Sequence, residues 1–307
     1  MKESLLFLSG FGDSCGSISV SMLSANFTNA HQAPAFEIMK KNLVCFVAAM
    51  TFLLRGTAAD YPIVYDGWDH GDPPFLLEDG WTPLLNGTNL DGWHVTDPRR
   101  EGAWMATKAV AWGGTNNPHA LVGRPEPGDR IVNTVKGRAS NLMCDTKMSD
   151  FELYIEFMIP QVSNSGVYLH GLYEMQIWDS YGIVPRLDTD RTGALYHYQA
   201  GLINGVEGGT VPLVRAERDH GQWNSYHVWY QAPRFDESGK KIQNAKVLRA
   251  LLNGQLIHEN KERLGRTTAS PDMPEATTNP VVMLQGDHGA VAFRNIYVRP
   301  LRPLPQP

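Results

Sequence analysis

The chain has 307 residues, of which 42% are hydrophobic and 19% charged, so its composition is that of an ordinary globular protein able to bury a full core. A formal net charge of −5 and the lack of a basic run in the sequence argue against a nucleic-acid-binding surface. The length allows one large or two small domains, and all-β domains often occupy roughly 200–250 residues as a single unit.

Residues 1–59 differ in composition from the rest of the chain. A lysine pair precedes a short apolar run that ends at Leu54, and small residues then lead to Ala59. This order is typical of a secretory signal peptide over 39–59, cleaved after Ala59. The apolar run is too short to span a bilayer comfortably, so we expect no stable membrane insertion; a retained N-terminal anchor is the alternative. We therefore predict an exported bacterial protein, either periplasmic or extracellular.

The signal-like pattern begins at an internal methionine. Residues 1–38 show no matching pattern, so we interpret them as a misassigned start before Met39 or as an unusually long leader. Without the leader, Cys144 is the single cysteine, which excludes an intrachain disulfide and a cysteine-based zinc site. The expected parts of the mature chain are an extension over 60–77, one domain over 78–302 and a proline-rich tail over 303–307.

Strands dominate the pattern of the mature chain. The segment 151–159 has an apolar side chain at every second position, and Asn253-Gly254 supplies the two positive-φ residues of a tight hairpin turn. No stretch keeps a helical period over three turns. Many short strands with long connections predict an all-β sandwich or jelly roll. The expected strands include 151–159, 223–231, 246–252, 255–258, 281–285 and 291–298.

Two further strands, 165–170 and 172–178, carry the most informative pattern. Residues two apart in a strand point to the same face of a sheet. The side chains expected to share one face are Leu172, Glu174, Gln176 and Trp178. A carboxylate, an amide and an indole on one face are typical of a sugar-binding cleft. The simpler interpretation is a half-exposed strand whose polar side chains face water.

Two of the ten histidines stand out in a chain that lacks the common nucleophile, nucleotide and zinc-protease motifs. His170 ends the first of these two strands, on the expected face of Tyr168. Asp287 and His288 precede a glycine on a turn, where a carboxylate and an imidazole can both point into a cleft. Such a pair suits proton transfer, and a hydrogen-bonded turn is the alternative.

Several blocks of sequence together resemble the 3-keto-disaccharide hydrolase domain family. They follow the family's order over roughly 78–302, and the match depends on their combination. The blocks are Gly80–Trp93, Leu142–Thr146, Asp150–Leu153, Asn164–Tyr168, Tyr173–Ser180, Thr192–Tyr196, Trp223–Tyr226, Ala232–Asp236, Asn253-Gly254 and Phe293–Ile296. The chain departs from the family's pattern at Leu172 and at His197-Tyr198.

The resemblance implies a concanavalin A-like jelly roll of two antiparallel sheets, with a concave sheet facing the substrate. It also implies hydrolysis of glycosides already oxidised to a ketone at sugar carbon 3, so the expected partner is a 3-keto sugar or glycoside. A weaker similarity is to laminarinase-type glucanases, whose three acids have the spacing of Glu174, Gln176 and Asp179. A retaining glucanase needs two carboxyl groups about 5–5.5 Å apart. The amide of Gln176 and the short Asp179 therefore argue against ordinary glucanase chemistry.

A ketone at carbon 3 opens another route, because it acidifies the proton on carbon 2. A base removes this proton, an enolate forms, the group on carbon 1 departs, and water adds to the enone. Glu174 or His170 is the expected base, and Asp179 or Asp287 would protonate or orient the reacting groups. The expected catalytic residues are Glu174, His170, Asp179 and His288, and the expected substrate-binding residues are Gln176, Trp178, Tyr168, Tyr196, His197 and Asp287.

The enolate needs an electrophile, for which Gln176, His288 or a bound cation is expected. A cluster of His, Asp and Glu side chains would hold a divalent metal ion, so a metal cofactor stays open. Two other functions stay open as well. The indoles of Trp178, Trp223 and Trp229 would equally serve a non-catalytic, lectin-like carbohydrate-binding domain, and the third alternative is an attachment domain of an export system.

Overall fold

The structure is a computed structural model. It describes residues 4–7, 21–24, 76, 78–100, 104–133, 139–183, 185, 187–198, 208–268 and 270–302. The chain divides into two compact units, Met1–Tyr61 and Pro62–Pro307. In the first unit, β1 (Ser4–Phe7) and β2 (Ser21–Ser24) form an antiparallel pair, and the expected signal segment 39–59 lies outside the described residues. None of the helices in the described part of the chain combines the length and the apolar character needed to cross a membrane.

The second unit is built on two antiparallel sheets. The eight-stranded sheet has the order β18-β17-β14-β11-β21-β8-β5, with β3 paired to β21. Its strands are β18 (Gln255–Arg263), β17 (Ala245–Leu252), β14 (Asn224–Gln231), β11 (Phe151–Met158), β21 (Val291–Pro300), β8 (Arg130–Asn133), β5 (Trp104–Thr107) and β3 (Thr82–Pro83). The five-stranded sheet has the order β13 (Tyr173–Trp178), β12 (Asn164–Leu169), β20 (Val282–Leu284), β9 (Leu142–Cys144) and β4 (Trp93–Val95).

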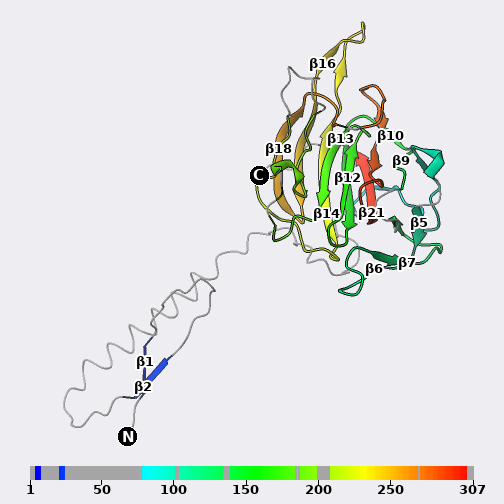
Figure 1. Cartoon of the computed structure of the whole chain (residues 1–307). Helices are drawn as coiled ribbons and strands as arrows, with labels where there is room; N and C mark the ends of the chain where they lie inside the picture. The colour runs from blue at the N-terminus through cyan, green and yellow to red at the C-terminus, as the bar shows by residue number, and fades with distance from the viewer. Residues whose placement is uncertain are drawn as a thin grey trace, which may run out of the picture. The chain divides into compact units, whose positions relative to one another are not determined.

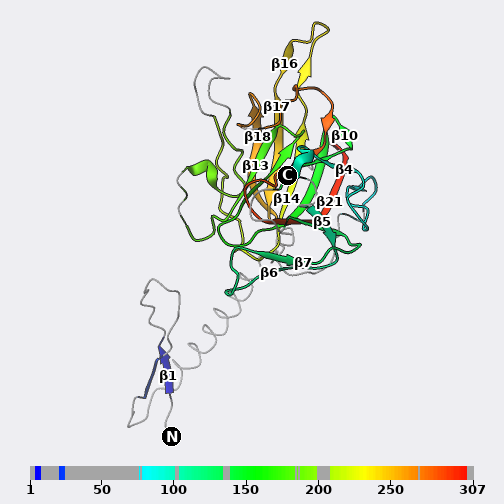
Figure 2. The same ribbon diagram turned by 45° about the vertical axis from the view of Figure 1, so that its right-hand side comes forward.

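Short strand pairs and turns of 3-10 helix complete the unit. The β15–β16 hairpin projects from one end of the sandwich, and the β6–β7 pair lies at the opposite end in both views (Figure 1, Figure 2). The short elements are β6 (Val110–Trp112), β7 (Leu121–Gly123), β10 (Lys147–Met148), β15 (Arg234–Phe235), β16 (Lys241–Gln243), β19 (Asn279–Pro280), η2 (Pro98–Arg100) and η3 (Asp188–Asp190).

The hydrophobic core lies between the two large sheets and follows from the period-two pattern. Phe151, Leu153 and Phe157 of β11 belong to the same buried cluster as Met175 and Ile177 of β13. Fully burying a side chain of this size stabilises the fold by about 1.5–3 kcal/mol. Since alternate residues of a strand point to opposite faces, the other side chains of β13 are directed away from this core. The predicted all-β jelly-roll sandwich is therefore confirmed.

The turn between β12 and β13 corrects one expectation about the faces. Leu172 is fully buried in the core cluster, whereas the sequence pattern places it on the face of Glu174. The strand begins one residue later, at Tyr173, and the amide of Leu172 donates a hydrogen bond to the carbonyl of Leu169 at 3.0 Å. Leu172 is thus a turn residue, to which strand alternation does not apply.

Candidate active site

One row of side chains crosses the outer face of the five-stranded sheet. Glu174 on β13 lies opposite Tyr168 on β12, and Tyr168 lies opposite Met283 on β20. The row continues to Met143 on β9 and ends at His94 on β4. Tyr168, Met143 and Met283 form a small buried cluster of their own, separate from the main core. The Glu174 side chain therefore lies beside this small buried cluster, on the face of the sheet that points away from the main core.

The next row of the same face contains two amides with a glycine between them. Gln176 lies opposite Gly166, and the backbone amide of Gln285 donates a hydrogen bond to the Gly166 carbonyl at 2.9 Å. A Cβ at Gly166 would clash with the Oε1 and Cγ atoms of Glu174, so the missing side chain provides the space for this carboxyl. The Oε1 atoms of Gln176 and Gln285 are buried without a hydrogen-bond partner in the part of the chain that is described. Both atoms are therefore acceptors that receive no hydrogen bond from the described residues.

Burial determines the acid–base chemistry of Glu174, whose exposed fraction is 3%. Loss of solvation raises the pKa of its carboxyl to about 8. The hydroxyl of Tyr168, within hydrogen-bonding reach, and the positive charges of His288 and Arg263 act in the opposite direction, since they favour the carboxylate. The result is a carboxyl that keeps its proton near neutral pH and becomes a comparatively strong base once it has lost it.

Asp287 and His288 form an ion pair that acts electrostatically on Glu174. The distance between His288 Nδ1 and Asp287 Oδ1 is 2.7 Å, and both side chains remain partly accessible to solvent. The hydrogen bond to Asp287 raises the pKa of His288, and the negative charge of Glu174 also contributes. Burial works to raise the pKa of Asp287, but the hydrogen bond and the charge of His288 lower it below its usual value. The structure therefore brings this predicted pair to the face of Glu174.

The remaining predicted substrate-binding residues lie around the same face. The backbone amide of Tyr196 donates to the carbonyl of Glu174 at 3.0 Å, and the rings of Tyr196 and His197 are 4.0 Å apart. The phenol of Tyr196 is also close enough to affect Tyr168 electrostatically. Trp178 ends β13 and is partly buried, with its backbone held by Thr192. These aromatic and imidazole groups therefore lie near the row of Glu174.

His170 is not part of this group. Its φ of 53° turns the chain after β12, and its ring packs against Phe151 and Tyr230 in the interior. The Nε2 atom lies 2.8 and 3.0 Å from the carbonyl oxygens of Met148 and Ser149, to which it donates. Burial lowers the pKa of His170 to about 4, so the ring is neutral. The expectation that His170 shares the face of Tyr168 is wrong, because strand alternation ends where φ becomes positive.

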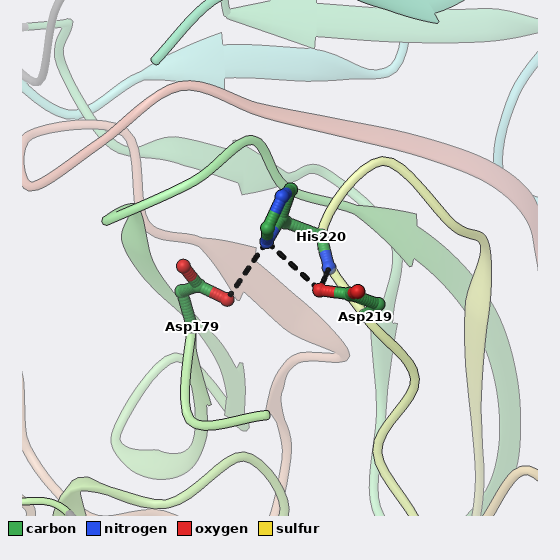
Figure 3. Close-up of side chains that lie close together, drawn as sticks. All are labelled: Asp179, Asp219 and His220. Atoms are coloured by element: carbon green, nitrogen blue, oxygen red, sulfur yellow. Dashed lines mark hydrogen bonds and ion pairs between the residues drawn. The ribbon is translucent and has the colours of Figure 1, made fainter. Parts of the chain in front are cut away.

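Asp179 lies beyond the end of β13 in a separate cluster with Asp219 and His220 (Figure 3). His220 Nδ1 is 2.9 Å from Asp219 Oδ1 and 3.6 Å from Asp179 Oδ1. The other oxygen of Asp179 accepts a hydrogen bond from the amide of Val162 at 2.7 Å. Two carboxylates and an imidazole are ligands suited to a divalent cation, so these residues could hold one. Asp179 thus belongs to a group of ligands distinct from the row of Glu174.

Three residues of the site are not among those expected from the sequence, although the sequence pattern around two of them indicates their position. Gly166 interrupts a strand, which marks a close approach of another group. Gln285 follows Met283 at the strand period, which places it on the same face. Arg263 carries no such signal. It is fully buried, donates from Nη2 to the Tyr196 carbonyl at 2.6 Å, and lies 4.4 Å above the ring of Tyr198.

The outer face of the five-stranded sheet thus carries a buried carboxyl, two amides and aromatic rings. The profile of the 3-keto-alpha-glucoside-1,2-lyase-like domain matches residues 80–299, and the chain belongs to this family. The resemblance inferred from the sequence blocks is therefore confirmed. In general terms, the protein is a carbohydrate-active enzyme.

One comparison with a solved structure supports the fold, and two further similarities are weaker. A candidate glycosyl hydrolase from Parabacteroides distasonis is 24% identical, with a TM-score of 0.50 over 73% of this chain and 84% of that one. A second candidate glycosyl hydrolase from this organism is 20% identical, with a TM-score of 0.44 over 72% of this chain and 99% of that one. An endo-beta-1,4-glucuronan lyase from Trichoderma reesei is 12% identical, with a TM-score of 0.34 over 70% and 94%. Comparison with curated protein sequences gives no match.

Proposed function

We propose that the protein cleaves the glycosidic bond of 3-keto-glycosides and 3-keto-disaccharides by elimination and subsequent addition of water. The observation that carries this proposal is the buried carboxyl of Glu174, whose pKa of about 8 makes it a strong base on a face lined by hydrogen-bonding groups. A proton beside a ketone is acidic enough for such a base, whereas an unactivated sugar carbon is not. The family's own description, a 1,2-lyase of 3-keto-alpha-glucosides, names the same pair of carbons.

The steps balance without an oxidant or a reductant. The carboxylate of Glu174 takes the proton from carbon 2, and the electron pair of that bond forms an enolate with the carbon 3 oxygen. The enolate then collapses to the ketone, a double bond forms between carbons 1 and 2, and the bond from carbon 1 to the leaving oxygen breaks. His288 in its protonated form supplies a proton to that oxygen. Water then adds its hydroxyl to carbon 1 and a proton to carbon 2, which gives the free 3-keto sugar.

The contacts of Asp179 favour elimination over double displacement as the mechanism. A retaining glycosidase needs a second carboxyl group about 5–5.5 Å from the first. The carboxylate of Asp179 is instead engaged by the amide of Val162 and lies beside His220. The ketone route needs a base and a proton donor, which Glu174 and His288 supply.

The experiment is to incubate the protein with 3-keto-trehalose and a 3-keto-glucoside, and with unoxidised trehalose and laminarin as controls. We expect cleavage of the keto sugars alone. In deuterated water, elimination places solvent deuterium on carbon 2 of the released keto sugar. Cleavage without deuterium at carbon 2 would contradict elimination and favour direct displacement. Binding without cleavage of any keto sugar would instead favour a lectin-like domain.

The cluster of Asp179, Asp219 and His220 makes a metal requirement testable in the same assay. We propose that a divalent ion bound there would serve the structure of the surrounding loops, since Glu174 belongs to a separate row of the site. Activity would then survive a chelator, and the chelator would lower the melting temperature. Loss of keto-sugar cleavage at an unchanged melting temperature would contradict this assignment.

We also propose that the protein is exported with removal of residues 39–59, because of the lysine pair, apolar run and small residues described above. Mass spectrometry of the exported protein should find a new N-terminus near Asp60. An intact leader on the soluble periplasmic or extracellular protein would contradict this proposal.

A further inference from the structure

A chain of side-chain contacts runs beside Gly166 from the residue after β20, across β12, to β13. The Nε2 atom of Gln285 donates to the hydroxyl oxygen of Tyr168 at 3.2 Å. That hydroxyl is within hydrogen-bonding reach of the carboxyl of Glu174, which lies over Gly166. All three side chains are more than nine-tenths buried. The chain of contacts therefore has a fixed order, from amide to phenol to carboxyl.

This order determines the direction of the phenol proton. A tyrosine hydroxyl has one proton to donate and can also accept. Since Gln285 occupies the oxygen as a donor, the proton of Tyr168 points away from Gln285 and toward the side of Glu174. Burial keeps the phenol protonated, because it raises the pKa of Tyr168 well above its usual value. Tyr168 is thus a directed hydrogen-bond donor.

The backbone around Gln285 is held on both sides. Its amide donates to the Gly166 carbonyl at 2.9 Å, and its carbonyl accepts from Ser165 Oγ at 2.8 Å. The next residue, Gly286, is held in the same way, since its amide donates to Asn141 and its carbonyl accepts from Asn133. These hydrogen bonds fix the backbone from which the Gln285 side chain projects, so its amide approaches Tyr168 from one direction.

The chemistry of the substrate matches this set of donors and acceptors. A ketone oxygen can only accept hydrogen bonds, so it cannot be bound by the buried Oε1 atoms of Gln176 and Gln285. Those two oxygens instead suit hydroxyl groups of the sugar, which donate. The phenol of Tyr168 is the buried donor directed to the base, and removal of a proton by Glu174 puts negative charge on the ketone oxygen at the neighbouring carbon.

We propose that Tyr168 donates a hydrogen bond to the carbon 3 oxygen as it becomes an enolate, and that Gln285 is the positioning residue that directs this donor. The proposal rests on the proposed elimination. In the step concerned, the bond between carbon 2 and its hydrogen breaks, the proton moves to Glu174, and the electron pair moves through carbons 2 and 3 to the oxygen that Tyr168 contacts. Tyr168 keeps its proton throughout: it donates to the Glu174 carboxylate before the step, and it turns this one hydrogen bond to the carbon 3 oxygen as Glu174 becomes protonated.

The test uses 3-keto-1-deoxyglucose, which has the acidic proton on carbon 2 but no leaving group on carbon 1. Exchange of this proton with deuterated water, followed by NMR, measures enolate formation apart from cleavage. Removing one donor to a developing oxyanion typically slows a reaction roughly 10²–10³-fold. We expect this loss for Tyr168→Phe, and a loss of roughly tenfold for Gln285→Met, the effect of one hydrogen bond. Binding of the keto sugar and the melting temperature should change little in both variants.

A double variant separates positioning from mere support of the fold. If Gln285 acts through Tyr168, then Tyr168→Phe combined with Gln285→Met exchanges no more slowly than Tyr168→Phe alone. Multiplied losses in the double variant would overturn the role of Gln285. Matched controls on the other sheet are Tyr154→Phe, which loses a buried hydroxyl bonded to Glu156, and Gln231→Met on β14. Both should exchange at the normal rate.

The outcomes also distinguish this inference from the proposed function. If the unaltered protein exchanges and cleaves keto sugars while Tyr168→Phe exchanges at the rate of Tyr154→Phe, the donor role is overturned and the function stands. If the unaltered protein exchanges no keto sugar, the proposed function fails and the donor role with it. If Tyr168→Phe does not fold, the Gln285→Met variant still decides the question, because an unchanged exchange rate there contradicts a directed donor.

Discussion

At the scale of single residues, the site depends on how closely Glu174 approaches Gly166. Any side chain at 166 would occupy the space of the Glu174 carboxyl, and the resulting burial raises the pKa of that carboxyl to about 8. A glycine and a glutamate on neighbouring strands thus produce the basicity that the proposed chemistry needs. Tyr168 and His288 then favour the carboxylate and keep it within reach of neutral pH.

Replacing Glu174 by Gln should abolish turnover of 3-keto-glycosides, because the amide cannot accept the carbon 2 proton. Loss of a general base typically slows a reaction roughly 10²–10⁴-fold. For the unaltered protein, exchange of the carbon 2 proton of 3-keto-1-deoxyglucose should accelerate with pH up to about 8, since the base works only after losing its proton and no leaving group has to be protonated. Turnover by the variant and exchange by the unaltered protein across pH measure the two effects. A profile that falls over this range would make Glu174 the acid, and near-normal activity of the variant would exclude both roles.

The raised pKa of Glu174 can also be tested without a substrate. The folded state holds a proton that the unfolded chain has already released at pH values between the ordinary glutamate pKa and about 8. The stability contributed by this group is therefore complete at acidic pH and is lost as the pH rises through this range. One pKa unit corresponds to about 1.4 kcal/mol, so the loss is on the order of a few kcal/mol. Urea unfolding of the Glu174→Gln variant should show it gaining stability relative to the unaltered protein as pH rises; a constant difference would contradict the raised pKa.

Replacing Gly166 by Ala should reduce activity by displacing Glu174. The added Cβ meets the flexible end of the Glu174 side chain, so the carboxyl moves while the backbone stays. Overpacking of this kind typically costs about 1–3 kcal/mol in stability. The matched control is Gly123→Ala on β7, where the added Cβ would find its nearest neighbour at 3.3 Å. The measurements are the activity and the melting temperature of both variants. Normal turnover by Gly166→Ala would show that the Glu174 carboxyl does not need its position over Gly166.

At the scale of elements, the period-two pattern predicts the strands well, because each strand must bury one face. The expected segments 151–159 and 223–231 agree with β11 and β14 to within one residue. Glu174 and Gln176 lie on the face opposite to the core, as alternation requires. Gln285 directly follows β20 and keeps its alternation, so this residue could have been assigned to the face from its spacing to Met283.

The pattern fails where a strand ends, since alternation then gives no direction. His170 has a positive φ and turns into the interior, and no feature of the local sequence fixes this angle. Asp287 and His288 reach Glu174 through the pairing of β20 with β12, which joins segments more than 100 residues apart in sequence (Val167 with Leu284, for example). Contacts of this kind depend on sheet order, which a single sequence does not specify. The same limit applies to Arg263 beneath Tyr196.

Replacing His170 by Asn should affect stability and leave the chemistry intact. Asn tolerates a positive φ, but it loses the ring contacts and the hydrogen bonds to the carbonyls of residues 148 and 149. The expected loss is about 1–3 kcal/mol. Because the folded pKa of His170 is lowered to about 4, its contribution is complete above its ordinary pKa and is lost as pH falls toward 4.

The variant should therefore unfold at lower urea concentration at neutral pH, and its stability should depend less on acidification. Turnover by the folded variant should match that of the unaltered protein. A loss of kcat with unchanged stability would return His170 to the role of a base.

At the scale of the whole molecule, charged residues on the outer face of the eight-stranded sheet connect distant parts of the chain. Arg299 on β21 contacts Glu152 on β11 with two hydrogen bonds of 2.6 and 3.0 Å, and Glu78 near the start of the domain at 2.8 Å. His227 on β14 adds a contact of 2.7 Å to Glu152. Glu152 is 1% exposed, so its charge depends on these partners. This network joins strands of the eight-stranded sheet, whereas the β12–β13 hairpin belongs to the five-stranded sheet.

Replacing Arg299 by Met should destabilise the whole domain, because it leaves the Glu152 carboxylate buried with His227 as its neighbour. Breaking a buried ion pair by removing one partner typically costs about 3–5 kcal/mol. The double variant Glu152→Gln with Arg299→Met should recover part of this loss, since it removes the unpaired charge as well.

The control is Lys246→Met, which breaks a more exposed pair with Glu262 and should cost about 1 kcal/mol or less. Thermal and urea unfolding measure all three variants. If Arg299→Met unfolds like Lys246→Met, the network does not stabilise the sheet, and the fold depends on the hydrophobic core between the sheets alone.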